Sequence, residues 1–101
     1  AFHAGVDLEA AEGSSVLAVA DGTVAASTYD MVYGNQITIR HADGMLTTYS
    51  HLSERLVSEG DSVRQGQIIG RSGATGWVTG PHLHLDVQGN GEYVDPLEAL
   101  G

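Results

Sequence analysis

The stretch QITIRHADGMLTTY, residues 36–49, decides the fold class. Polar and apolar residues alternate strictly in its first five positions, which is the two-residue period of a strand with one face buried. The dipeptide Asp43-Gly44 is a tight-turn signal, and the run 45–49 after it is again rich in strand-forming residues. The stretch therefore predicts an antiparallel hairpin in which Ile37 and Ile39 point inward.

Similar short runs separated by turn residues recur along the chain. Residues 16–19 and 23–27 flank Asp21-Gly22 and predict another hairpin. Further strands are expected around Val63, at 67–70 and at 83–87. The only helix signal lies at 95–100, where Asp95 can cap free amides and Pro96 suits the first helical position. The prediction is a mainly β fold with at most one short C-terminal helix.

Length and composition predict one folded domain spanning residues 1–101. The chain is 42% hydrophobic and 17% charged, which is enough apolar material for a packed interior. It has no apolar run near the ~20 residues of a membrane-spanning helix, and its first residues do not resemble an export signal. We therefore expect a trimmed segment without membrane insertion, and a monomer.

Charge and cysteine content exclude several classes of partner and site. The formal net charge is −9, whereas binding to nucleic acid or an anionic membrane depends on clustered positive charge. The chain has no cysteine, so disulfides and thiolate zinc sites are impossible. Histidine, aspartate and glutamate remain as metal ligands.

His82 and His84 form the first candidate site. They stand two residues apart at the start of an alternating strand, so both imidazoles project on one face and could hold a metal. Two polar residues on the solvent face of a strand would give the same alternation. The pair alone is a weak motif.

A second pair, His3 and Asp7, combines an imidazole with a carboxylate near the N-terminus. Catalytic zinc uses such mixed sets, although an exposed, frayed terminus would explain the pair equally well. With one histidine of the 82/84 pair, these residues supply three ligands and leave a fourth position open. An open position is typical of catalytic zinc, and a spare histidine beside it could act as general acid or base.

The two other histidines are read differently. His51 follows the predicted strand 45–49, where a strand gives way to a loop and site residues tend to collect, so it could face the same cleft. His41 ends the alternating run just before the Asp43-Gly44 turn. We predict an exposed, structural role for His41 and leave it out of the site.

These residues stand in motifs that resemble the LytM/lysostaphin-type zinc metallopeptidases, which cut peptide cross-links or stem peptides in bacterial peptidoglycan. The motifs are H-x-x-x-D at 3–7, Y-x-H-L at 49–52 and G-x-x-G-x-T-G-x-x-x-G-P-H-L-H at 70–84. The resemblance covers residues 2–100. The departures are Asp86, where a glutamate is frequent, and Trp77 and Val78 in a loop that commonly has smaller or polar residues.

The resemblance implies a curved, largely antiparallel β fold with a groove. It implies one Zn²⁺ held by His3, Asp7 and His84, with His82 and His51 as the catalytic pair. A zinc endopeptidase acting on the wall outside the cytoplasmic membrane is the function implied, and its export signal would have to lie upstream. Trp77 is expected beside the groove, with burial in the core as the alternative.

Two other functions come from the same features. Inactive relatives keep the fold and activate other cell-wall hydrolases, but they typically lack ligands or catalytic histidines, and all five positions are filled here. The hairpin-like segment 63–70 resembles that of lipoyl or biotin carriers. A carrier needs an acceptor lysine, and the chain has none.

Overall fold

A computed structural model describes residues 2–9, 13–42, 44–73 and 82–89, with side chains for 13–42 and 44–73. These residues form eight strands and, within those ranges, no helix. The strands are β1 (Phe2–Glu9), β2 (Ser15–Leu17), β3 (Gly22–Asp30), β4 (Gly34–Arg40), β5 (Leu46–Arg55), β6 (Ser62–Val63), β7 (Ile68–Ser72) and β8 (His82–Gly89). The mainly β class is confirmed. The helix predicted at 95–100 lies outside the described residues, and none that could cross a membrane occurs inside them.

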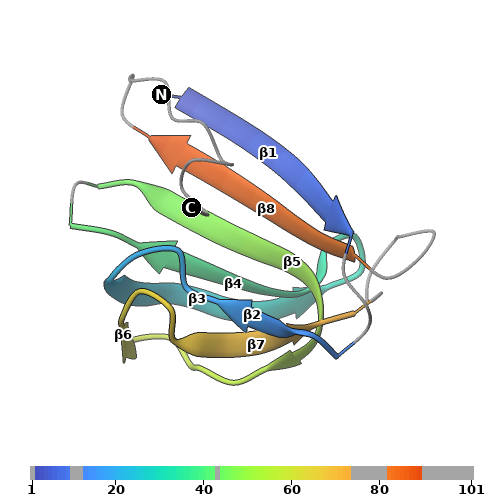
Figure 1. Ribbon diagram of the computed structural model, residues 1–101. Helices are drawn as coiled ribbons and strands as arrows, with labels where there is room; N and C mark the ends of the chain where they lie inside the picture. Colours follow the sequence, from blue (N-terminus) through green and yellow to red (C-terminus); the bar gives the residue numbers. More distant parts are fainter. Residues whose placement is uncertain (1, 10–12, 43, 74–81, 90–101) are drawn as a thin grey trace.

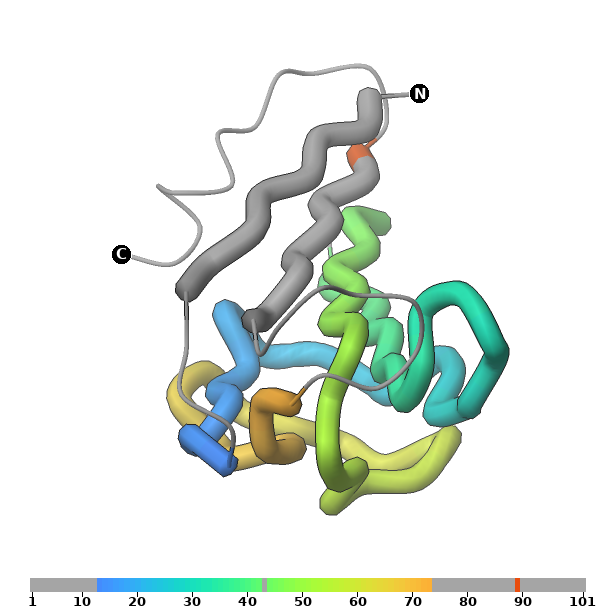
Figure 2. Tube along the Cα trace, turned by 90° about the vertical axis from the view of Figure 1, so that its right-hand side faces the viewer, coloured from blue at the N-terminus to red at the C-terminus, as the bar shows by residue number. Residues whose placement is uncertain are grey.

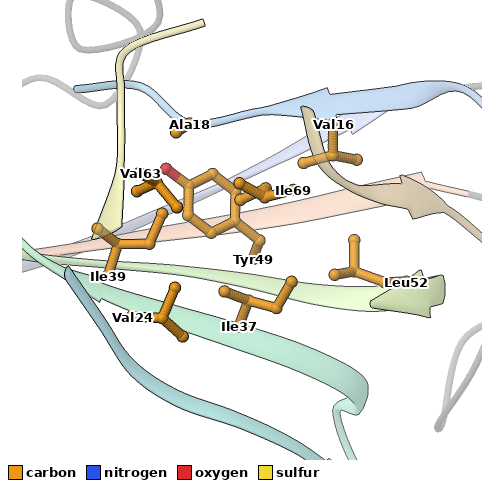
Figure 3. Packing of buried hydrophobic residues seen from close by; sticks show 9 residues of the cluster. All are labelled: Val16, Ala18, Val24, Ile37, Ile39, Tyr49, Leu52, Val63 and Ile69. Atoms are coloured by element: carbon orange, nitrogen blue, oxygen red, sulfur yellow. The ribbon is translucent and has the colours of Figure 1, made fainter. Parts of the chain in front are cut away.

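All the pairings are antiparallel and join the strands into one curled sheet (Figure 1). The main path runs β1-β8-β5-β4-β3-β6, and β7 pairs with both β2 and β5. Because the sheet curls, β2 and β7 lie across a common interior from β3 and β4 (Figures 1 and 3). The curved, largely antiparallel sheet that the family resemblance implied is therefore present.

The interior is a single apolar cluster centred on Tyr49 (Figure 3). Its nine buried members are Val16, Ala18, Val24, Ile37, Ile39, Tyr49, Leu52, Val63 and Ile69. Ile37 and Ile39 have no exposed surface, as the alternation in β4 predicted. Burial of these side chains is the main force that closes the curl, since each buried Val, Ile or Leu contributes about 1.5–3 kcal/mol.

The predicted hairpin between β4 and β5 is confirmed, with Ile39 opposite Thr47. The hairpin predicted around Asp21-Gly22 is wrong, because β2 pairs with β7 while β3 pairs with β4 and β6. Gly22 begins β3 instead of forming a turn. A Cβ at this position would lie 2.5 Å from the Arg40 carbonyl oxygen, so glycine is what permits the close approach of β3 to β4.

Strand β5 changes its neighbour on one edge part-way along its length. Residues 46–50 pair with β8, whereas 52–55 pair with β7, and β4 lies along the other edge throughout 46–52. The residue at the change of neighbour is His51. In Figure 2, β5 (green) runs down the molecule and the tip of the β3–β4 hairpin (teal) projects beside it.

Candidate functional site

His51 lies inside β5 and not in a loop after it, because the strand continues to Arg55. Ile37 pairs with Tyr49 and Asn35 with Leu52, so β5 carries one more residue than β4 across this interval. This is a β-bulge, which disrupts the ladder locally and re-aims side chains, and bulges are frequent beside active sites.

The backbone of His51 has a φ of 62°, in the left-handed region. Every other positive φ in the described residues belongs to glycine. A side chain costs about 1–2 kcal/mol in this conformation. Strained residues of this kind cluster at functional sites, where the surrounding structure holds them in place.

The tip of the β3–β4 hairpin holds His51 from the side. The His51 N–H donates to the Tyr33 carbonyl oxygen at 2.8 Å, and the two ring centroids lie 6.3 Å apart with a 40° tilt. His51 is only 8% exposed, whereas Tyr33 is 45% exposed. The sequence analysis missed Tyr33. A turn signature, Asp30 followed four residues later by Gly34, is the signal that could have pointed to it.

The backbone register brings three of the strands together at His84. Asp7 of β1 pairs with His84 of β8, and on its other side His84 pairs with Ser50 of β5. Ser50 directly precedes His51, so the backbones of Asp7, His84 and the bulge stand at one level of the sheet.

The remaining predicted residues flank this level. His82 pairs with Glu9, two residues beyond Asp7, and His3 pairs with Gln88, four residues before Asp7. Their side chains, and Trp77, lie outside the described set. Among the side chains inside that set, no three His, Asp or Glu residues gather as a metal site.

Ser50 provides an independent observation at this level. Ser50 is fully buried. Among the buried side-chain polar atoms of the described residues, its hydroxyl oxygen is the one for which no hydrogen-bond partner is found. Leaving a hydroxyl buried and unsatisfied costs about 1–3 kcal/mol. An orphaned hydroxyl on the residue whose backbone pairs with His84 makes Ser50 a candidate partner for a group bound at this level.

His41 is not exposed as predicted but buried, with 9% of its surface accessible. Its Nδ1 lies 2.7 Å from the Asp21 carbonyl oxygen and its Nε2 lies 2.9 Å from Thr47 Oγ1. The predicted exposure was wrong because partners distant in sequence hydrogen-bond both ring nitrogens, and a polar ring that keeps its hydrogen bonds can be buried. Both partners lie outside the candidate site, as expected for a structural histidine.

The same network reaches Tyr49 at the centre of the core. Thr47 Oγ1 donates to the Tyr49 phenol oxygen at 3.0 Å, and the Val19 N–H donates to it at 3.1 Å. Burial raises the pKa of the phenol, against the smaller lowering effect of these two hydrogen bonds. Tyr49 therefore stays neutral and anchors β5 one residue before Ser50.

The family model described as Peptidase family M23 matches residues 1–96. The chain belongs to this family. The Peptidoglycan DD-endopeptidase ShyC of Vibrio cholerae is 46% identical over 94 residues, which is 93% of this chain and 22% of that protein. The chain thus spans about a fifth of the length of this curated relative.

Solved structures agree with the M23 assignment. The catalytic domain of the antimicrobial peptidase lysostaphin from Staphylococcus simulans matches with a TM-score of 0.86 and 38% identity, covering 95% of this chain and 77% of that one. A zinc containing peptidase from Vibrio cholerae matches with a TM-score of 0.85 and 37% identity, over 96% of this chain and 29% of that one. The M23 chain therefore has the curled sheet of a known peptidase domain.

Proposed function

We propose that residues 1–101 form one catalytic domain, a zinc-dependent endopeptidase that hydrolyses peptide bonds in bacterial peptidoglycan. Family membership supports peptide hydrolysis, and the similarity to a protein named as a peptidoglycan DD-endopeptidase supports the substrate. The observation that carries the proposal is the register across β1, β8 and β5. It brings Asp7, His84 and the strained His51 segment to one level of the sheet.

The donor set fits zinc. His3, Asp7 and His84 would hold the ion, and two imidazoles with one carboxylate are a common ligand set for catalytic zinc in a chain without cysteine. The pairing of Asp7 with His84 supports this set, as does the buried Ser50 hydroxyl beside it, since ligating histidines usually have a hydrogen-bond partner on the other ring nitrogen. When bound, zinc supplies Lewis acidity toward a peptide carbonyl.

The two remaining histidines would move protons. His51 and His82 each carry an imidazole nitrogen that can accept a proton from the attacking water and return it to the leaving amine. The bulge supports this role for His51, because it fixes the backbone from which the ring projects. Burial of His51 excludes much of the bulk water from around its ring, which strengthens the electrostatic interactions it can make.

The substrate would be a peptide cross-link or stem peptide of the wall, met outside the cytoplasmic membrane or in the envelope, by a monomer. The formal charge of −9 argues against a polyanion as the preferred partner. The alternative is a catalytically silent module that activates other cell-wall hydrolases. Such a module would act at the cell wall without cleaving its peptides.

Zinc content and hydrolysis of defined peptidoglycan fragments, measured together, test the proposal. We expect three variants to lose both bound zinc and hydrolysis: His3→Ala, Asp7→Asn and His84→Ala. His51→Ala and His82→Ala should keep zinc while the rate falls about 10²-fold or more. The matched control is His41→Ala, which should lower stability but leave the zinc content of the folded protein unchanged.

Two results would contradict the proposal. A zinc-loaded parent that cleaves no fragment would favour the activator function. Full hydrolysis by the metal-free protein would exclude zinc dependence. If His82→Ala empties the site while His84→Ala retains metal, the two histidines have exchanged roles.

A further inference from the structure

We infer that the tip of the β3–β4 hairpin is a positioning element for His51. Asp30 fixes the conformation of this tip, and Tyr33 makes its contact with His51. The tip would set the direction of the imidazole without touching the substrate bond. The inference rests on the proposed function for the role of His51, but its structural content can be measured separately.

The Asp30 carboxylate organises the tip by itself. Its Oδ1 accepts the backbone N–H groups of Val32 at 2.8 Å and Tyr33 at 2.6 Å, and its Oδ2 accepts Gln36 Nε2 at 2.9 Å. Hydrogen bonds to an ionised acceptor are about twice as strong as neutral ones. One side chain therefore fixes the conformation of the turn as far as Tyr33.

Tyr33 connects the tip of the hairpin to β5. Its carbonyl oxygen accepts the His51 N–H at 2.8 Å, across 18 residues of sequence. The bulge interrupts the regular ladder between β4 and β5, and there the His51 N–H bonds to the carbonyl of Tyr33, a residue just before β4. The Tyr33 ring also lies against the imidazole, with the 6.3 Å centroid separation of an aromatic pair.

The residues after His51 are tied to the same hairpin. Asn35 Nδ2 donates to the Leu52 carbonyl oxygen at 3.0 Å, and Arg55 Nε donates to Asn35 Oδ1 at 3.1 Å. The bulge is thus fastened on one side by Tyr33 and on the other by Asn35. Rotation of His51 about its backbone is restricted by both.

The tip contributes little to the core, which separates positioning from stability. Its apolar side chains are largely exposed: Tyr29 by 59%, Met31 by 86%, Val32 by 53% and Tyr33 by 45%. Loosening the tip should therefore cost little free energy of unfolding while it frees His51.

Asp30→Ala and Asp30→Asn test the inference. Alanine removes both acceptors, whereas asparagine keeps Oδ1 for the two backbone N–H groups. For Asp30→Ala we expect kcat to fall about tenfold or more with KM and zinc content unchanged, since small misplacement of a reacting group costs this much. Hydrogen exchange of the His51 amide should accelerate about tenfold or more as its acceptor is freed. Asp30→Asn should leave kcat and the exchange rate of the His51 amide at the values of the parent protein.

Asp61→Ala is the matched control. Asp61 Oδ2 accepts the Ser58 N–H at 2.8 Å in another exposed turn, where the same kind of cap has no connection to His51. It should change neither kcat nor the His51 amide. An unchanged His51 amide and kcat in Asp30→Ala would overturn the inference, and so would equal effects of the two alanine variants. If the parent protein does not cleave peptidoglycan, amide exchange still decides whether the hairpin holds His51.

Discussion

Replacing His51 by glycine or by alanine separates the strain at this residue from its chemistry. Both variants lose the imidazole and its contacts, so they differ only in whether a Cβ occupies a backbone with φ of 62°. A Cβ in that region costs about 1–2 kcal/mol, and glycine loses about 0.5–1 kcal/mol through its greater freedom in the unfolded chain. His51→Gly should therefore be more stable than His51→Ala by about 0.5–1 kcal/mol, although we expect both to lose about 10²-fold or more in rate.

Urea denaturation at neutral pH measures this difference. With a slope of about 1–3 kcal/mol per molar urea, the midpoint of His51→Gly should lie a few tenths of a molar above that of His51→Ala. The control is Ser53, an exposed residue of the same strand that has no positive φ. Ser53→Gly should be less stable than Ser53→Ala. If His51→Ala proves as stable as His51→Gly, the left-handed backbone and the bulge built on it are wrong.

Three further substitutions probe the core and the candidate site. Tyr49→Phe should flatten the alkaline loss of stability: burial raises the pKa of Tyr49 in the folded state, so its contribution is present below about pH 10 and is lost as pH rises through the folded-state value, as urea midpoints from about pH 8 to 11 would record. Ser50→Ala should weaken zinc affinity about tenfold or more in a chelator competition if the buried hydroxyl supports a ligand. Unchanged zinc affinity with equal or higher stability would show that the hydroxyl has no role in metal binding. Gly70→Ala should lower the thermal midpoint by several degrees, because its Cβ would lie 2.7 Å from the Glu54 carbonyl oxygen, and a midpoint equal to the parent's would contradict the tight β5–β7 pairing.

The strands that the sequence predicted best are those with a local signal. Alternation around Ile37 and Ile39 identified the buried face of β4, and Asp43-Gly44 identified its hairpin with β5. Strand β2 was found, but its partner was not. Its pairing with β7 joins residues more than 50 positions apart, and nothing in a local pattern encodes such a choice.

The bulge could not be predicted for a related reason. Ser50, His51 and Leu52 are all buried, which breaks the alternation by which a strand is recognised, so β5 seemed to end at Tyr49. His41 was misjudged because its burial depends on acceptors supplied by distant segments. Polar residues are assigned to the surface unless such partners are known.

Residue types and spacing indicated His3, Asp7 and one histidine of the 82/84 pair as ligands. The choice of His84, with His51 and His82 as catalytic groups, was implied by the family resemblance and stays a prediction. What the structure adds is the register that lines up Asp7 and His84 with Ser50. Spacing within one segment cannot give this, because it depends on how three segments align.

The position of β5 bears on how this domain could be engineered. Tyr49 anchors the core, while Ser50 and His51 stand at the candidate site, so residues that hold the domain together directly adjoin residues proposed for its chemistry. If His51 has the proposed role, libraries that randomise β5 for thermostability would select replacements that relieve its left-handed backbone and lose activity with them. Surface positions on β3 and around β6, such as Thr23 and Ser62, are exposed and free of that conflict. A thermostable variant is best sought there.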